Sequence, residues 1–121
     1  MHSVDSAYRE SIHTPIEKAA EELQDILSRQ LTAYAIGVKD GQTVARWAGG
    51  DVHGMRRESE RRIRAAYGIL QILRTRYESP QTLRAWFIGM NPALQDESPA
   101  HAIRNGHLRE AMAAAYSFVH D

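Results

Sequence analysis

Three prolines stand directly after a hydroxyl side chain, at Thr14-Pro15, Ser79-Pro80 and Ser98-Pro99. A serine or threonine oxygen accepts hydrogen bonds from the free N–H groups at a helix start, and proline suits the first helical position because its missing N–H needs no partner there. Each pair therefore predicts the beginning of a helix. Thr14 also has Glu17 three residues later, which is the pattern of a capping box.

Apolar side chains repeat at helical spacing after these starts. The pattern predicts a first helix over about residues 15–30, behind a flexible N-terminal arm over residues 1–13. A long central helix is predicted after Arg57, where a broad apolar stripe indicates that other elements cover it on two sides. Three more helices are predicted: one from Pro80 to Gly89, a short one from Pro99 that stops at Asn105-Gly106, and a last one that includes Leu108 and Phe118.

Residues 31–50 (LTAYAIGVKDGQTVARWAGG) fit two local structures. Asp40-Gly41 between two apolar runs is typical of a β-hairpin. The same residues fit two helices joined by a turn, with Asp40 capping the second helix and with Val44 and Trp47 facing the core. The pattern alone does not separate the two structures. We favour the helices because the remaining chain is helical and an isolated hairpin is only marginally stable.

The composition is that of one folded chain of 121 residues, with 43% hydrophobic and 25% charged side chains. Fifteen Lys and Arg balance fifteen Asp and Glu, which excludes a uniformly basic nucleic-acid-binding chain. The absence of cysteine excludes a disulfide framework and suits a reducing cytoplasm. The N-terminus has no basic stretch followed by an apolar one, so the sequence predicts a cytoplasmic protein that does not cross a membrane.

Basic side chains concentrate in the middle of the chain, where residues 39–76 contain nine Lys or Arg and four Asp or Glu. In a helix-turn-helix, the second helix contacts base edges and flanking basic residues bind phosphates. An arginine-rich helix face that pairs with nearby glutamates in solvent is the alternative interpretation. The candidate DNA-binding residues are Lys39, Gln42, Thr43, Arg46, Arg56 and Arg57.

The sequence contains no motif of a cofactor site or an active site. Its six histidines have no metal-ligand spacing. A nucleophile elbow, a phosphate-binding loop and a dinucleotide glycine motif are all missing from the sequence. We therefore expect a protein that is not an enzyme and that holds no metal or cofactor.

Several landmarks in a fixed order resemble a family of bacterial proteins. The C-terminal landmarks are Trp86 in an apolar helix, Asn91-Pro92 with Leu94 after it, Pro99 opening a short helix, and Asn105-Gly106 before a final helix. In this order they resemble the toxin-binding domain of the Xre/MbcA/ParS family of antitoxins. Upstream, Thr43-Val44-Ala45-Arg46-Trp47, followed by Gly49 and Gly50, is similar to the Xre-like helix-turn-helix that precedes this domain.

The resemblance implies an all-α fold in which a helix-turn-helix region over residues 14–56 is joined by a central helix to a toxin-binding domain, both within residues 57–121. It implies the antitoxin of a type II toxin–antitoxin system that occludes the active site of a RES-domain, NAD-degrading toxin. A homodimer, a hetero-oligomer with the toxin, and repression of its own operator DNA are further implications. The candidate toxin-binding residues are Asn91, Pro92, Arg104, His107, Arg109, Tyr116, Phe118 and His120. The alternative is a stand-alone helix-turn-helix transcription regulator.

Overall fold

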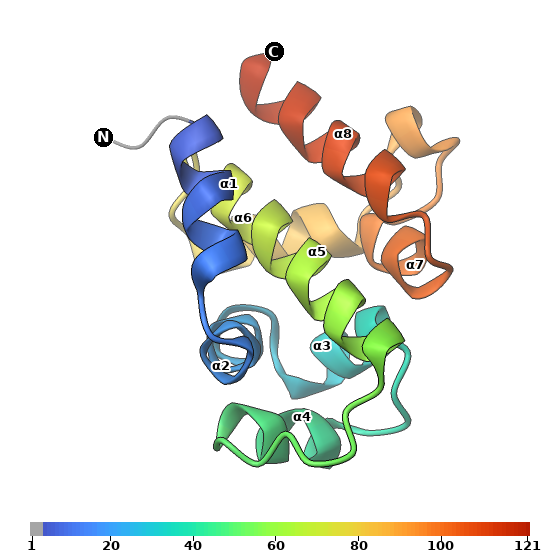
Figure 1. Cartoon of the computed structure of the whole chain (residues 1–121). Coiled ribbons are helices and arrows are strands. Elements are labelled where there is room, and N and C mark those ends of the chain that lie inside the picture. The colour runs from blue at the N-terminus through green and yellow to red at the C-terminus, as the bar shows by residue number, and fades with distance from the viewer. Residues whose placement is uncertain (1–3) are drawn as a thin grey trace.

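The computed structural model describes residues 4–121, and within this range the chain forms helices and loops without any strand (Figure 1). The prediction of an all-α fold is therefore confirmed. In chain order the elements are α1 (Val4–His13), α2 (Ile16–Leu27), α3 (Arg29–Ile36), α4 (Gly41–Ala48), α5 (Arg57–Arg74), α6 (Pro80–Ile88), the short 3₁₀ helix η1 (Pro92–Leu94), α7 (Pro99–Arg104) and α8 (Leu108–His120).

Two of the three predicted serine or threonine caps are present. The Ser79 oxygen accepts a hydrogen bond from the Thr82 N–H at 3.4 Å, and the Ser98 oxygen accepts one from the His101 N–H at 3.1 Å. The predicted capping box at Thr14 is wrong. The Thr14 hydroxyl donates instead to the Glu10 carbonyl at 3.0 Å, and α2 begins at Ile16 without a side-chain cap. Another helix ends at His13, directly before Thr14, and the Thr14 hydroxyl binds a carbonyl that is left free in the last turn of that helix.

That preceding helix, α1, occupies residues for which the sequence predicts a flexible arm. Residues 4–13 are helical, so the prediction is wrong for them, and residues 1–3 of the arm lie outside the described part of the chain. Ala7 and Ser11 are buried where α1 packs against α5. The Arg64 guanidinium on α5 donates to the carbonyls of Ser11 and Thr14. Val4, Ala7, Tyr8, Ser11 and Ile12 recur at helical spacing, so the sequence does carry a periodic signal for α1, and the prediction of a flexible arm did not use it.

The first long helix also ends earlier than predicted. It stops at Leu27, and Ser28 adopts φ 89°, a conformation that residues other than glycine rarely take. The Ser28 oxygen then accepts a hydrogen bond from the Leu31 N–H at 3.2 Å and caps α3. The chain therefore turns sharply at Ser28, between α2 and α3, whereas helical spacing alone predicts that the first helix continues to about residue 30.

Residues 31–50 contain the end of α3 and all of α4, joined by residues 37–40, so the preferred prediction is confirmed and the hairpin alternative is wrong. Asp40 caps α4 as predicted, because its Oδ1 accepts hydrogen bonds from the Gln42 and Thr43 N–H groups at 3.1 and 3.3 Å. Val44 and Trp47 are buried, also as predicted. Helices α2, α3 and α4 pack against one another at one end of the molecule (Figure 1).

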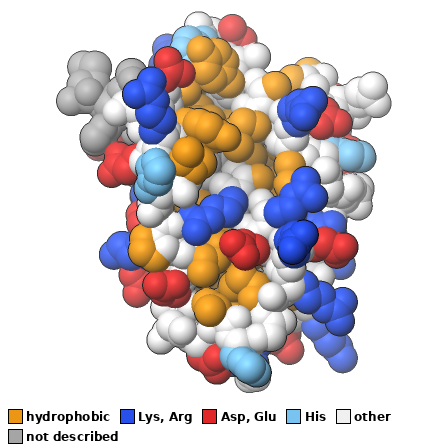
Figure 2. Space-filling model, in the orientation of Figure 1, with side chains coloured by type: hydrophobic (Ala, Val, Ile, Leu, Met, Phe, Trp, Pro, Cys, Tyr) orange, Lys and Arg blue, Asp and Glu red, His pale blue; other side chains and the backbone are white. Residues whose placement is uncertain are grey.

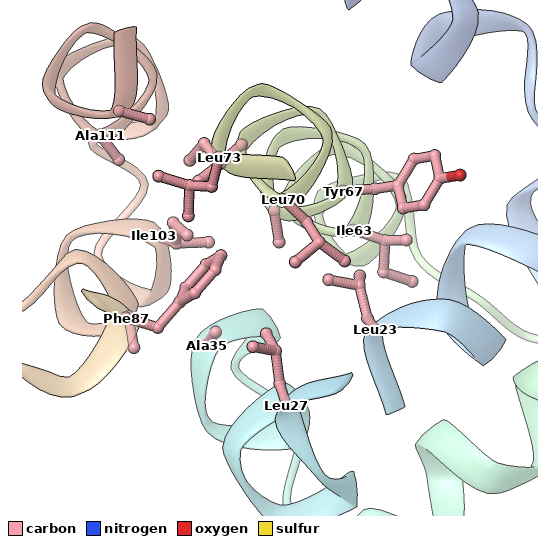
Figure 3. Close-up of a cluster of buried hydrophobic side chains, with 14 of the residues drawn as sticks. Leu23, Leu27, Ala35, Ile63, Tyr67, Leu70, Leu73, Phe87, Ile103 and Ala111 are labelled. Carbon is pink, nitrogen blue, oxygen red and sulfur yellow. The ribbon is translucent and has the colours of Figure 1, made fainter. Parts of the chain in front are cut away.

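Helix α5 runs through the middle of the molecule, and α1, α2, α3, α6, α7 and α8 pack on it, whereas α4 packs on α2 and α3 (Figure 1). Leu23 and Leu27 of α2 meet α5 side chains from one direction, and Phe87, Ile103 and Ala111 meet them from another (Figure 3). The hydrophobic core therefore continues from α2 to α8. The domain boundary predicted between residues 56 and 57 crosses this continuous core, so neither part buries its apolar side chains alone.

A polar network joins α2 to α5 beside this core. Glu22 accepts a hydrogen bond from the Tyr67 hydroxyl at 2.8 Å and forms an ion pair with Arg74 at 2.9 Å. Arg74 also donates to the Gln71 side chain at 2.8 Å. Burial of the Tyr67 phenol, reinforced by its hydrogen bond to Glu22, raises the pKa of Tyr67 from 10.0 to about 12. Folding therefore favours the protonated phenol.

This raised pKa predicts a loss of stability at alkaline pH. An acid whose pKa is higher in the folded state contributes its full stability below the unfolded pKa of about 10 and loses it as the pH rises through the folded value. We expect the free energy of unfolding to fall by on the order of 2 kcal/mol between about pH 9 and pH 12 because of Tyr67. Tyr67→Phe should lack this part of the pH dependence.

Urea unfolding, followed by circular dichroism at several pH values, measures the effect. Tyr77→Phe is the matched control, because the hydrogen bond between Tyr67 and Glu22 remains intact in that variant. The interpretation fails if Tyr67→Phe and Tyr77→Phe lose stability equally with rising pH.

Candidate binding surfaces

The structure distributes the eight predicted toxin-binding residues over three places. Asn91 and Pro92 lie at η1, and Arg104 lies at the end of α7. The remaining residues lie at or along α8: His107, Arg109, Tyr116, Phe118 and His120. These places differ in how far their side chains are available to a partner.

Asn91 has a role within the chain. Its side-chain oxygen accepts a hydrogen bond from the Ala93 N–H at 3.0 Å, and this bond starts η1. Pro92 occupies the first turn of η1, and Leu94 at its end is buried in the core. The pair Asn91-Pro92 therefore fixes the loop between α6 and α7.

Arg104 also has intramolecular partners. Its guanidinium donates to the Tyr34 carbonyl at 2.8 Å and lies 4.8 Å from the centre of the Tyr34 ring. The His101 ring stacks on the same tyrosine, with the ring centres 6.5 Å apart. These contacts fasten α7 to α3. Arg104 also lines an open hollow of about 770 Å³, together with Lys39 and its neighbours in the turn before α4.

Helix α8 has a buried side made of small residues and an exposed side with rings. Ala111, Ala114, Ala115 and Val119 face the core. On the exposed side, the Tyr116 ring stacks on His120 with the ring centres 4.1 Å apart. The Phe118 ring is 39% exposed and lies 5.2 Å from the Tyr77 ring and 6.2 Å from the Trp86 ring, measured between centres.

The last turn of α8 is held in place by contacts to the rest of the chain. Val119 is buried, and its carbonyl accepts a hydrogen bond from the Arg76 guanidinium at 2.9 Å. His107 is exposed and stands at the residue before α8 begins, without a side-chain capping bond. The C-terminal rings are therefore exposed on an anchored helix.

The predicted DNA-binding residues lie at α4 and at the start of α5. Gln42 and Arg46 are exposed on α4, whereas Thr43 is half-buried. Lys39 is exposed in the turn between α3 and α4. Arg56 directly precedes α5, and Arg57 is its first residue. Arg57 lines a hollow together with Tyr8 and Ile12, and this hollow is not the one that Lys39 lines. Helix α4 lies at the opposite end of the molecule from the C-terminal turn of α8 (Figure 1).

A groove between α1 and α8 is the surface that sequence reasoning missed. An apolar band follows the space between these helices, and Lys and Arg side chains border it (Figure 2). Two adjoining hollows of about 440 and 570 Å³ form the groove and share Tyr8, Leu108 and Met112. The groove was missed because one of its walls is α1, a helix that the sequence did not predict.

Comparisons of this chain with family models, curated proteins and solved structures found no match. Within residues 4–121, no three His, Asp or Glu side chains gather closely enough to hold a metal ion. No helix in the described range is long and apolar enough to span a membrane.

The cap at η1 leads to a prediction about the contribution of Asn91 to stability. Asn91→Ala removes the acceptor for the Ala93 N–H, and we expect the free energy of unfolding to fall by about 1 kcal/mol. Asn91→Asp retains an acceptor at this position and should keep most of the stability. Thermal unfolding by circular dichroism checks both variants. An alanine variant as stable as the wild type would show that the cap contributes nothing measurable.

Proposed function

We propose that this chain is the cytoplasmic antitoxin of a type II toxin–antitoxin system and that it has no enzymatic activity. It binds a RES-domain toxin and occludes the active site that degrades NAD, as a homodimer that joins the toxin in a hetero-oligomer. The resemblance in the order of Trp86, Asn91-Pro92, Pro99 and Asn105-Gly106 is the sequence support for this proposal.

The observation that carries the proposal is the presence of exposed rings on two sides of an anchored C-terminal helix. Tyr116 and Phe118 are 46% and 39% exposed, and His120 stacks on Tyr116. Aromatic side chains are the type that most often anchors protein interfaces. Because Val119 and Arg76 already hold the last turn, its residues lose little conformational freedom when a partner binds. Exposed aromatics in this arrangement fit a protein-binding surface.

An NAD-consumption assay with a purified RES-domain toxin, encoded beside this protein, tests the proposal. The equimolar wild-type chain should abolish NAD loss. Phe118→Ala should weaken toxin binding at least tenfold, which corresponds to about 1.4 kcal/mol. Gln42→Ala, an exposed substitution on the distant helix α4, should neutralise the toxin like the wild type. Circular dichroism verifies that both variants are folded.

Two results would count against this proposal. A toxin that stays fully active beside equimolar wild-type protein would contradict the antitoxin function. A folded Phe118→Ala protein that binds the toxin as tightly as the wild type would contradict the placement of the inhibitory surface at the end of α8.

We also propose that the chain binds its own operator DNA through α4, and a specific arrangement supports this second function. Residues 37–40 join α3 to α4, Val44 and Trp47 hold α4 on the core, and Gln42 and Arg46 face solvent. In a helix-turn-helix, the second helix presents such side chains to the major groove of DNA. The same surface would serve the alternative function, a transcription regulator that acts alone.

Gel-shift assays on upstream DNA and on unrelated DNA test this second proposal. Arg46→Ala should lose roughly 1–3 kcal/mol of discrimination between the two DNAs, since a base contact is lost. Arg56→Ala should weaken binding to both DNAs alike, since a phosphate contact carries no sequence information. Equal and sequence-independent losses in the two variants would leave only electrostatic adhesion to DNA.

A further inference from the structure

The groove between α1 and α8 is lined by apolar side chains that stay exposed within residues 4–121. Tyr8 and Ile12 of α1 are 44% and 49% exposed, and Tyr116 of α8 is 46% exposed. Leu108 and Met112 are partly buried and lie between these walls, in contact with the core. Large apolar side chains gathered in one exposed groove are typical of a surface that binds a partner.

The floor of this groove is fixed by the packing of α1 and α8 on α5. Gly68 of α5 lies so close to both neighbours that an added Cβ would meet Met112 at 3.3 Å and the Ser11 hydroxyl at 3.5 Å. Arg64 holds the end of α1 through the carbonyls of Ser11 and Thr14. The two walls therefore stand at a set distance from each other, and the groove exists without a partner.

The charges along the groove are predominantly basic. Arg57, Arg61 and Arg64 line one end with a single acidic neighbour, Glu60, and Arg109 lines the other end. Within the described range, the Arg64 guanidinium has hydrogen-bond partners, and the other three guanidinium groups have none. None of the four arginines forms an ion pair with a carboxylate of residues 4–121. Arg57, Arg61 and Arg109 are exposed and available to carboxylates from outside the chain.

We propose that this groove binds an acidic amphipathic α-helix of a partner protein. Such a helix places apolar side chains at positions i, i+3, i+4 and i+7 into a groove between two helices. Its apolar face would cover Tyr8, Ile12 and Met112, and its glutamate or aspartate side chains would pair with Arg61 and Arg109. A concave groove with two helical walls fits a helix better than it fits a flat lipid surface. The groove shares Tyr116 and Arg109 with the proposed toxin surface. The inference goes beyond the proposed function because most of the other lining residues lie on α1, α5 and the first half of α8, whereas Phe118 lies on the side of α8 that faces Trp86 and Tyr77.

Two matched peptides test the proposal on the full chain without any toxin. Both are 18-residue amphipathic helices with the same leucines, and their polar faces carry glutamate in one peptide and lysine in the other. Fluorescence anisotropy should show at least tenfold tighter binding of the glutamate peptide. Amide NMR shifts caused by this peptide should be concentrated at Tyr8, Ile12, Leu108 and Met112.

Charge reversal tests whether binding depends on the groove. Arg61→Glu should weaken binding of the glutamate peptide at least tenfold. Arg29→Glu is the matched control, because it makes the same charge change at an exposed arginine on α3, outside the groove, and should leave peptide binding unchanged. Ile12→Asn, which leaves the arginines in place, should also weaken binding, and circular dichroism verifies that each variant is folded.

Several outcomes would overturn the proposal. Equal affinity for the two peptides would show that the basic side chains do not select an acidic helix. Equal losses of peptide affinity in Arg61→Glu and Arg29→Glu would show that the peptide does not bind in the groove. No binding of the glutamate peptide at millimolar concentration would show that the groove does not accept such a helix. Binding of phosphatidylglycerol vesicles in the absence of glutamate-peptide binding would identify the surface as a lipid contact instead.

Discussion

Burial of α5 is the constraint on which the rest of this structure depends. The helices around α5 are short, from six residues in α7 to thirteen in α8, and helices of this length are marginal in water on their own. They become stable because their apolar side chains pack against α5, and each fully buried leucine, isoleucine or phenylalanine contributes about 1.5–3 kcal/mol. Leu70 and Leu73 meet partners from several helices at once (Figure 3). The fold is therefore cooperative across its whole length.

Small residues decide how closely the outer helices approach this central one. Gly68 on α5, Ser11 on α1 and the buried alanines of α8 leave room for three helices to meet. The large apolar side chains of α1 and α8 cannot all enter that contact, so Tyr8, Ile12 and Tyr116 remain at the surface. The groove is thus a consequence of tight packing beneath it. The same packing gives a partner a rigid surface.

For the candidate interface residues, the sequence predicted which side chains are exposed better than it predicted their partners within the chain. The family resemblance led to Tyr116, Phe118 and His120, and these rings lie at the surface of α8. The sequence did not show that Asn91 caps η1 or that Arg104 binds the Tyr34 carbonyl, seventy residues away. A polar side chain pairs with the groups that the fold places beside it, and these groups can be far away in the sequence, as the Arg104–Tyr34 contact shows. Arg57 illustrates the same point, since it lines the groove with Tyr8 as well as beginning α5.

The sequence by itself determined the helical class and most helix starts, because serine, aspartate and proline signals act through hydrogen bonds within one turn. Asp40, Ser79 and Ser98 cap their helices for this local reason. Tertiary structure decided the features that depend on distant contacts. The place where α1 packs is set by Gly68 and Arg64 of α5, and Ser28 takes a left-handed conformation where the chain turns from α2 into α3. The groove belongs to this second group, since it exists only where α1 and α8 pack on one helix.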